Sequence, residues 1–257
     1  MPAVTTLRKR VISLQISLIS YAGALQTILQ LGKTKTPSYA CFANAHMTVE
    51  AKKSLVFKNQ VDQSTFTFAD GMPLVFALRM LYGIKQERIA GMDFMGSVLH
   101  ECEKNQLPVF FYGSTPEVLQ QLKNKVQEKF PALAVAGMIS PPFRPLTNEE
   151  TGRMIDSINS SGAHLVFVGL GCPKQEMWMA NNSRHINACL LGVGGAFEIY
   201  AGLAKRAPQW MCRAGLEWLF RFSQEPRRLF KRYAVTNTYF VCLFIKQFLL
   251  LRVFKRM

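Results

Sequence analysis

Asp70 is the acidic residue whose position in the sequence is best suited to chemistry. It follows the apolar run Phe66–Ala69 and precedes Gly71-Met72-Pro73. An acid at the carboxyl end of a strand faces the ligand crevice of an open α/β sheet, where it can accept a proton as a general base. The alternative is structural, because an Asp just before a helix that starts near Met72 suits an N-cap.

Other polar side chains could bind a ligand. Gln175 and Glu176 begin a predicted helix after Gly171-Cys172-Pro173-Lys174, where they can hydrogen-bond a sugar or a phosphate, or cap that helix. Arg88 and Arg206 can neutralise a diphosphate without a metal ion, and the alternative for each is a solvated surface position.

Several motifs of other enzyme classes are missing from the sequence. The four aspartates, Asp62, Asp70, Asp93 and Asp156, include no DxD pair, which many nucleotide-sugar enzymes use to hold a metal. No GxxxxGK(S/T) loop, GxSxG elbow or HExxH helix occurs, which argues against a P-loop NTPase, an α/β-hydrolase and a zinc protease. The four histidines are too scattered for a metal cluster, so we predict neither a metal nor a cofactor.

Several predicted strands end in glycine-containing turns that lead into helices. Glycines let the backbone approach a phosphate, and helix N-termini favour anions. A purely structural role for each turn is the alternative, but the four together indicate a nucleotide-type ligand. The turns are Ala69-Asp70-Gly71, Gly113-Ser114-Thr115-Pro116, Gly169-Leu170-Gly171-Cys172-Pro173 and Gly192-Val193-Gly194-Gly195.

Short apolar runs alternate with helical patterns through the centre of the chain. This alternation predicts βαβ units, and hence an α/β fold with a Rossmann-like, mostly parallel sheet flanked by helices. The predicted strands are Tyr39–Ala43, Phe66–Ala69, Val109–Tyr112, Ala134–Met138, Leu165–Gly169 and Cys189–Val193. The predicted helices are 46–57, 72–82, 93–105, 115–129, 147–160 and 174–184.

The net charge of +15 is confined to the two ends of the chain. Residues 1–35 carry five basic side chains and no acid, residues 36–202 carry 14 of each sign, and residues 203–257 carry 12 basic and two acidic side chains. A neutral centre with basic ends indicates a catalytic body held near a polyanion, either nucleic acid or an anionic membrane. We therefore divide the chain into a catalytic domain, 1–202, and a basic amphipathic helical appendage, 203–257.

Two apolar segments raise the question of membrane insertion or targeting. The segment after Arg8-Lys9-Arg10 is interrupted by Gln and Ser, so we interpret it as the first helix or strand of the fold, with a targeting or membrane segment as the alternative. The C-terminal stretch YFVCLFIKQFLLLRVF contains Lys246 and falls short of the roughly 20 residues that span a bilayer, which favours an interfacial helix. The six cysteines form no CxxC pair, which favours a reducing, cytosolic setting.

Taken in order, the motifs from about residue 37 to 233 resemble the WecG/TagA/CpsF family, glycosyltransferase family 26. The matching segments are Phe68-Ala69-Asp70-Gly71-Met72-Pro73, Arg88-Ile89-Ala90-Gly91-Met92-Asp93, Val109-Phe110-Phe111-Tyr112-Gly113-Ser114, Gly169-Leu170-Gly171-Cys172-Pro173-Lys174-Gln175-Glu176, Gly192-Val193-Gly194-Gly195-Ala196-Phe197, Ala201-Gly202, Arg206-Ala207-Pro208, Gly215-Leu216-Glu217-Trp218-Leu219-Phe220-Arg221 and Glu225-Pro226-Arg227-Arg228.

The resemblance implies an inverting, metal-independent glycosyltransferase. Such enzymes move N-acetylmannosamine, its uronic acid or a glucose-type sugar from a nucleotide donor, usually UDP-linked, to a polyprenyl-diphosphate-linked saccharide. It implies work at the cytoplasmic face of the inner membrane, with peripheral attachment to the anionic surface. It places Asp70 at the base position. It places Asn44, Arg88, Gln175, Glu198, Arg206, Arg213, Arg221 and Arg228 at substrate-binding positions.

The sequence departs from the family pattern at three places near the donor or acceptor pocket. These are Phe42 in place of a Thr, Ser140-Pro141-Pro142-Phe143 in place of a Gly-Tyr-Phe segment, and Glu198 in place of an Asp. They bear on the identity of the sugar more than on the reaction type.

Two other function classes remain as alternatives. One is a Rossmann-like nucleotide-binding enzyme such as an NAD-dependent one, although no early GxGxxG with a downstream acid occurs. The other is a basic nucleic-acid-binding protein, although the leucine- and aromatic-rich C-terminus suits a lipid surface better, so we expect no nucleic-acid partner. A homo-oligomer is compatible with the sequence.

Overall fold

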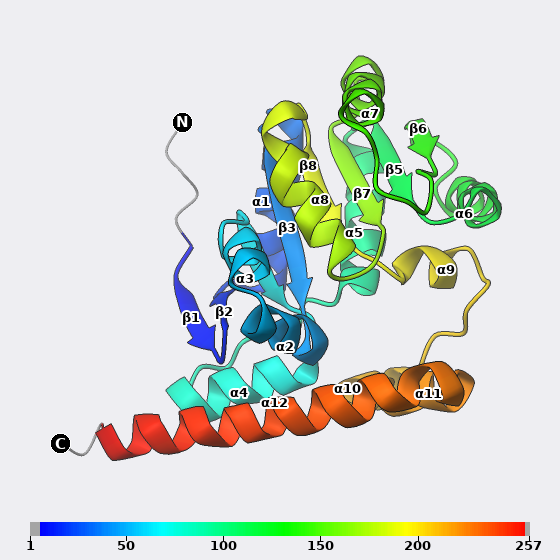
Figure 1. Cartoon of the computed structure of the whole chain (residues 1–257). Coiled ribbons are helices and arrows are strands. Elements are labelled where there is room, and N and C mark those ends of the chain that lie inside the picture. Colours follow the sequence, from blue (N-terminus) through cyan, green and yellow to red (C-terminus); the bar gives the residue numbers. More distant parts are fainter. Residues whose placement is uncertain (1–5, 255–257) are drawn as a thin grey trace.

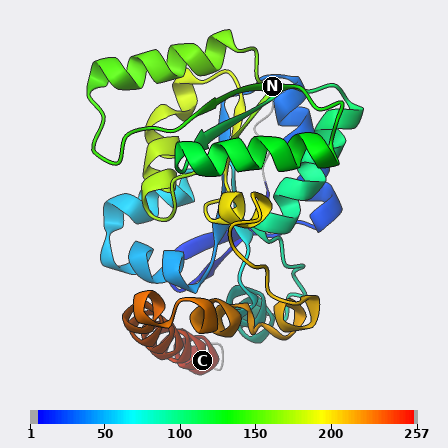
Figure 2. The ribbon, with the colours of Figure 1, turned by 90° about the vertical axis from the view of Figure 1, so that its right-hand side faces the viewer.

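The computed structural model is a six-stranded sheet between two layers of helices, with a helical appendage beneath (Figure 1). The structure describes residues 6–254, except for the side chains of Arg213, Arg228, Lys231, Arg232 and residues 252–254. Figure 2 shows the same layers from the side, with the appendage gathered at one end of the body.

Every neighbouring pair of strands in the large sheet is parallel, in the order β4-β3-β8-β7-β5-β6. The six predicted strands are therefore confirmed, and each boundary is either exact or shifted by one residue. The strands are β3 (Ser38–Ala43), β4 (Phe66–Ala69), β5 (Val109–Gly113), β6 (Val135–Ile139), β7 (Leu165–Gly169) and β8 (Cys189–Gly192).

Alternate residues of the central strands pack into two separate cores. On β5, Val109 and Phe111 face one core while Phe110 and Tyr112 face the other. Helices must cover both faces of such a sheet, which is why the strands appear in the sequence as continuous apolar runs. The predicted α/β Rossmann-like fold is confirmed.

Helices on both faces connect the strands. The first core includes residues of α1, α5, α6 and α9, and the second includes residues of α2, α3, α4, α7 and α8. Their bounds are α1 (Tyr21–Lys33), α2 (Ala45–Lys53), α3 (Leu55–Asp62), α4 (Met72–Tyr82), α5 (Gly91–Lys104), α6 (Pro116–Lys129), α7 (Asn148–Ser160), α8 (Lys174–Asn182) and α9 (Ala196–Tyr200).

One predicted helix is two helices in the structure. The pattern 46–57 is divided at Ser54, whose extended backbone ends α2 and whose side chain accepts a hydrogen bond from the Phe57 N–H to begin α3. The prediction of a single helix is wrong here because apolar periodicity continues across a break made by one capping serine.

The N-terminal segment is an antiparallel hairpin, β1 (Arg8–Val11) and β2 (Leu14–Ser17), followed by α1. The hairpin covers the β4 edge of the sheet: the Ser17 hydroxyl accepts a hydrogen bond from the Thr67 N–H at 3.0 Å. Arg8 donates to the carbonyls of Ser64 and Thr65. Val11, Leu14 and Ile16 are buried, so this segment packs as part of the fold.

The appendage contains α10 (Gln209–Ala214), α11 (Glu217–Gln224) and the long helix α12 (Pro226–Phe254). α12 lies across the base of the body against α2 and α4 (Figure 1). Phe240 and Thr236 are buried. Near the end of α12, the Gln247 carboxamide accepts from the Ile12 N–H at 2.6 Å and donates to the Arg10 carbonyl at 3.0 Å. One face of α12 is therefore docked on the body.

The apolar part of α12 is longer than the sequence analysis allowed. Tyr233–Leu251, 19 residues with a mean hydropathy of 1.5, is long and apolar enough to cross a membrane by length and composition, and 11% of it is buried. The expectation that this run is too short is wrong, because one lysine on a continuous helix does not shorten its apolar surface. Core helices of soluble proteins and signal sequences can have the same length and composition.

Candidate functional site

Two neighbouring strands bring Asn44 and Asp70 together at the carboxyl edge of the sheet. The Asp70 N–H donates to the Ala43 carbonyl at 2.9 Å, which fixes the end of β4 beside the end of β3. A Cβ atom placed on Gly71 would lie 3.3 Å from the Cβ of Asn44. Asn44 caps α2, because its Oδ1 accepts from the Met47 N–H at 3.1 Å.

The Asp70 carboxyl does not cap the helix that follows. The N-cap of α4 is Gly71, with no side-chain capping bond, so the structural alternative raised for Asp70 is wrong. The side chain of Asp70 is 25% exposed. Burial and the neighbouring Glu217 carboxylate raise the pKa of Asp70 to about 7, against the opposing effects of Arg88, Arg221 and a hydrogen bond from the Gly91 N–H.

Arg88 lies directly beside Asp70. The loop between α4 and α5 is held by the Ile89 N–H, which donates to the Ala69 carbonyl at 2.9 Å. The Arg88 Nε donates to the Asp70 carbonyl at 2.5 Å, and one terminal nitrogen lies 3.8 Å from the Asp70 carboxylate. The guanidinium is therefore fixed within ion-pair distance of the candidate base.

The appendage completes this cluster from the other side. Glu217 on α11 accepts from Arg88 at 2.5 Å and from Arg221, one turn later, at 3.0 Å. Arg206, in the segment before α10, forms an ion pair with Asp93 in the first turn of α5. The helix α5 begins at Gly91, beside Asp70, so both ion pairs join the appendage to the same edge of the body.

Gln175 is buried, and its carboxamide bonds to groups of the protein itself. Its Nε2 donates to the Gly192 carbonyl at 2.8 Å and to the Glu176 carboxyl at 2.7 Å, while its Oε1 accepts from the Gly171 N–H at 3.2 Å. This side chain therefore ties the turn after β7 to the turn after β8.

Glu176, the residue after Gln175, is fully buried. Burial raises the pKa of its carboxyl to about 7, while hydrogen bonds from Gln175 and Cys172 act in the opposite direction. An acid with this pKa in an apolar setting is neutral for part of the time near pH 7, which lowers the cost of burying it.

Glu198 is exposed in the first turn of α9, just after the glycine turn of β8. A Cβ atom on Gly195 would lie 3.3 Å from the Glu198 carboxylate. In that turn Gly194 has a φ of 54°, a left-handed conformation that favours glycine. Glu198 and Gln175 thus border the ends of β8 and β7, and β3 separates those ends from the Asp70 cluster on β4.

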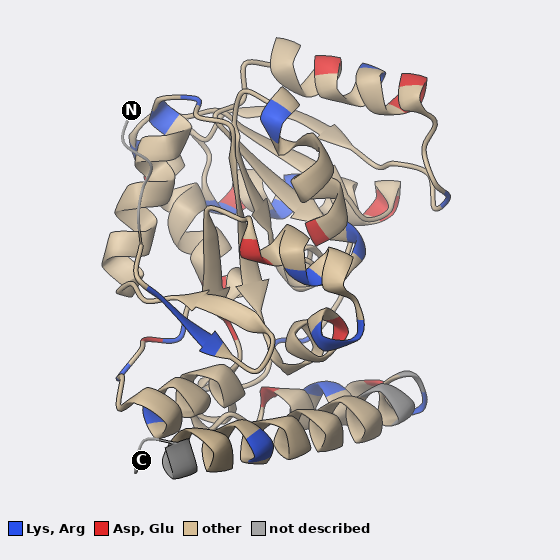
Figure 3. Ribbon diagram, turned by 60° about the vertical axis from the view of Figure 1, so that its left-hand side comes forward, with Lys and Arg blue, Asp and Glu red and all other residues tan. Residues whose placement is uncertain are grey.

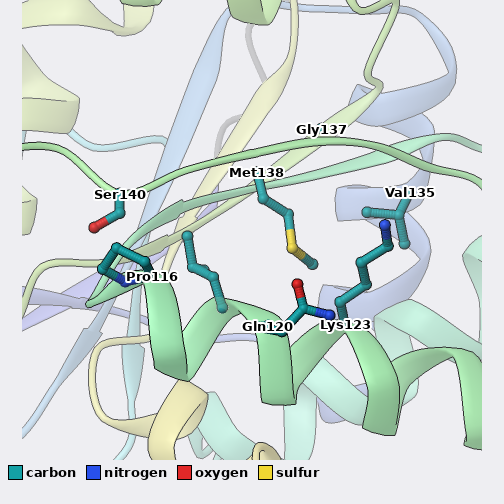
Figure 4. Close-up of a pocket in the computed structure, with 8 residues that line it drawn as sticks. Pro116, Gln120, Lys123, Val135, Gly137, Met138 and Ser140 are labelled. Atoms are coloured by element: carbon teal, nitrogen blue, oxygen red, sulfur yellow. The ribbon is translucent and has the colours of Figure 1, made fainter.

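A hollow lies at the β6 side of the sheet, between α6 and β6 (Figure 4). Its volume is about 340 Å³, and its lining carries one charged side chain. Asp70 follows β4, the other edge strand, so this cavity is separate from the cluster described above. The lining residues are Pro116, Leu119, Gln120, Lys123, Val135, Gly137, Met138 and Ser140.

The structure brings most of the predicted site residues together at the carboxyl ends of the strands, on the β4 side of the sheet. Asp70, Arg88, Arg221 and Asn44 form one group, and Arg206 approaches it through Asp93. Arg213 and Arg228 were also predicted to bind substrate, but their side chains lie outside the described residues.

Two carboxylates of the site were missed as site residues by the sequence reasoning. Glu217 had a detectable signal, because it lies four residues before Arg221 on a helix, the spacing of an ion pair. Asp93 ends one of the segments that resemble the family, but its pairing with Arg206 had no local signal, since Arg206 is far away in the sequence. Among the described residues, no three His, Cys, Asp or Glu side chains are grouped so as to hold a metal ion.

A comparison with protein families identifies the chain. Residues 9–253 match the model of the Glycosyl transferase WecG/TagA/CpsF family. The match covers the α/β body, the Asp70 cluster and nearly all of the appendage. Enzymes of this family act in cell-surface polysaccharide synthesis and in general use a nucleotide-sugar donor and a lipid-linked acceptor. The chain belongs to the WecG/TagA/CpsF family and is a glycosyltransferase.

Proposed function

We propose that this enzyme transfers a hexose, N-acetylhexosamine or uronic sugar, with inversion and without a metal ion, from a UDP-linked donor to a polyprenyl-diphosphate-linked saccharide. One observation carries the proposal: the half-buried Asp70 carboxyl lies at the carboxyl edge of a parallel sheet, 3.8 Å from the Arg88 guanidinium. A base beside a fixed cation is what direct displacement at a sugar phosphate needs.

The proposed reaction is a single displacement at the anomeric carbon. The acceptor hydroxyl oxygen forms a bond to the anomeric carbon while the bond from that carbon to the donor phosphate oxygen breaks. Asp70 takes the hydroxyl proton, and the nucleoside diphosphate leaves with the electrons of the broken bond. Attack from the face opposite the leaving group inverts the anomeric configuration.

Arginines supply the charge that the leaving diphosphate requires. Arg88 and Arg221 lie on either side of Glu217 at the Asp70 edge, and Arg206 approaches the first turn of α5. Guanidinium groups bind phosphate oxygens through paired, charge-assisted hydrogen bonds. We assign Arg213 and Arg228 to the same role on the family resemblance alone.

The turns after β7 and β8 are assigned to the donor side of the crevice. Gln175 bonds to both turns, so we propose that it shapes this part of the pocket. Glu198 projects beside the β8 turn and Asn44 lies next to Gly71, which suits contacts with sugar hydroxyls. Ligands of open α/β sheets bind in this position, outside the carboxyl ends of the strands.

We further propose that the outer side of the appendage rests on an anionic membrane at its cytoplasmic face. Large apolar side chains are exposed along α12, including Val241, Ile245 and Leu249, and α4 beside it adds Phe76 and Met80. Figure 3 shows that α12 carries few charged residues along most of its length. A long helix that is docked on one side and apolar on the other suits peripheral attachment.

The test of the function is an assay of the full chain against a panel of UDP-sugars, with an undecaprenyl- or short-chain polyprenyl-diphosphate-linked saccharide as acceptor. We expect transfer from one donor class, release of UDP and an inverted anomeric centre in the product by NMR. A retained configuration, or UDP release that never requires the lipid-linked acceptor, would contradict the proposal.

A further inference from the structure

Glu217 is a carboxylate of the appendage that contacts the catalytic edge of the body. Its two oxygens are divided between two arginines: Oε2 lies 2.5 Å from Arg88 and Oε1 lies 3.0 Å from Arg221. Arg88 comes from the body and Arg221 from α11, so a single carboxylate holds guanidinium groups of both regions together. The side chain of Glu217 is 27% exposed, so an incoming anion has access to it.

Glu217 shares its two oxygens between these arginines, and Arg88 also lies 3.8 Å from the Asp70 carboxylate. A nucleoside diphosphate carries more negative charge than Glu217 and presents several oxygens to two guanidinium forks. The pair also lies near the start of α5, where backbone N–H groups favour an anion. A diphosphate in the place of the Glu217 carboxylate would therefore satisfy the two arginines better than Glu217 does.

We propose that Glu217 is a placeholder that holds Arg88 and Arg221 in position without substrate and gives way to the diphosphate of the donor. This inference rests on the proposed function, because it assumes that these arginines bind the leaving group. Donor binding would break the contacts of Glu217 with both arginines and leave the arginines on the diphosphate. Glu217 is thus a positioning residue and a competitor for the donor site.

Replacing Glu217 with a neutral residue also changes the environment of Asp70 in the free enzyme. The charged groups that face Asp70 are Arg88 from the loop before α5, and Glu217 and Arg221 from α11; the Gly91 N–H also donates to it. Burial is the main cause of the raised pKa of Asp70, and the negative charge of Glu217 is the second. Without that charge, the pKa of Asp70 falls, and the base stays deprotonated at a lower pH.

The experiment measures UDP affinity by calorimetry and the pH dependence of kcat/KM in the full chain, comparing Glu217→Gln with the unchanged enzyme. We expect UDP to bind about three- to tenfold more tightly, since the amide no longer competes as an anion. We also expect the acidic limb of the pH profile to move down by roughly half a unit to one unit. Weaker or unchanged UDP binding in this variant would overturn the proposal.

Three controls separate the charge of Glu217 from other effects. Glu217→Asp keeps the charge and should not tighten UDP binding. Glu128→Gln removes a carboxylate of equal charge that pairs with Lys125 on the exposed side of α6, and should leave UDP affinity unchanged. Gly215→Ala disturbs the docking of the appendage, because the new Cβ lies 3.1 Å from Met72 at a left-handed position, yet it keeps the Glu217 carboxylate and its pair with Arg221 within α11.

If Gly215→Ala tightens UDP binding as much as Glu217→Gln, a looser appendage explains the effect and the placeholder role is wrong. If the unchanged enzyme binds no UDP, the proposed function and this inference fail together. If the unchanged enzyme binds UDP and Glu217→Gln binds it more weakly, only this inference fails.

Discussion

The α/β body and the appendage place their apolar side chains in opposite ways. In the body, Phe111 and Phe167 stack with ring centroids 5.5 Å apart and are fully buried between the helix layers. In the appendage, Trp210 and Phe230 are both 64% exposed, and Leu249 is 55% exposed. The body is therefore stabilised by its own core, whereas the appendage depends on one docked helix face and a few ion pairs.

This difference matches the two kinds of group that the regions contribute to the candidate site, the proposed base from the body and a cation from the appendage. Asp70 belongs to the body, at the end of a strand whose residues are buried. The charge that completes its surroundings comes from α11, which is joined to the body through Glu217. A weakly attached element that carries cations can move when an anionic donor binds, because its ion pairs exchange with the ligand at little cost.

The largest expected effect tests the catalytic part of the body. Asp70→Asn removes the proposed base and nearly preserves the shape of the side chain, so transfer should fall by about 10²–10⁴-fold while UDP binding survives. Initial-rate kinetics and UDP calorimetry measure the two properties separately. Near-normal turnover in this variant would rule out Asp70 as the base.

The next prediction compares the two regions by their stability. Phe111→Ala leaves a cavity among Phe167 and Phe197 and should lower the free energy of unfolding by about 3–5 kcal/mol. Ile245→Ala, on the exposed side of α12, should change it by less than about 0.5 kcal/mol. Urea unfolding followed by circular dichroism measures both. Similar costs for the two variants would mean that α12 is packed as firmly as the sheet.

A third prediction addresses what the exposed side of α12 contacts. Ile245→Glu combined with Leu249→Glu should weaken co-sedimentation with phosphatidylglycerol vesicles by about tenfold or more, since it removes apolar burial and adds repulsion. The matched control is Phe143→Glu combined with Met177→Glu, which changes exposed apolar residues of the body by the same charge.

The variant that combines Ile245→Glu with Leu249→Glu should still transfer sugar to a short-chain, water-soluble acceptor. Equal loss of vesicle binding in test and control variants would mean that net charge, and not the apolar face of α12, holds the protein on the membrane. Truncation near Tyr233 is a less specific experiment, because it also removes the buried Phe240 and the contacts of Gln247.

The smallest expected effect concerns metal ions. Because arginines of both regions are assigned to the leaving diphosphate, excess EDTA should leave the rate of transfer largely unchanged. The measurement is the initial rate with and without chelator, followed by readdition of Mg²⁺ or Mn²⁺. A rate that is lost with EDTA and restored by either ion alone would contradict the assignment.

Much of the body could be predicted from the sequence because its signals are local. Buried parallel strands need continuous apolar runs such as Leu165–Gly169, and the helices between them carry their own periodicity, so strand and helix positions follow from short windows. The place of Asp70 at the end of a strand could be predicted for the same reason, since a strand end and the following turn are adjacent in the chain. The uneven charge, neutral in residues 36–202 and basic afterwards, is likewise visible in the sequence and is the basis of the predicted division into body and appendage.

Contacts between distant segments were decided only by the tertiary structure. No local pattern shows that Glu217 meets Arg88, that Asp93 meets Arg206 or that Gln247 holds the hairpin at Ile12, because these partners are brought together only when the chain packs. The pKa of Asp70 depends on burial and on Glu217, so it too follows from packing. The sequence determines which residues can do the chemistry, and the fold determines which charges surround them, because electrostatic interactions depend on distance in space and not along the chain.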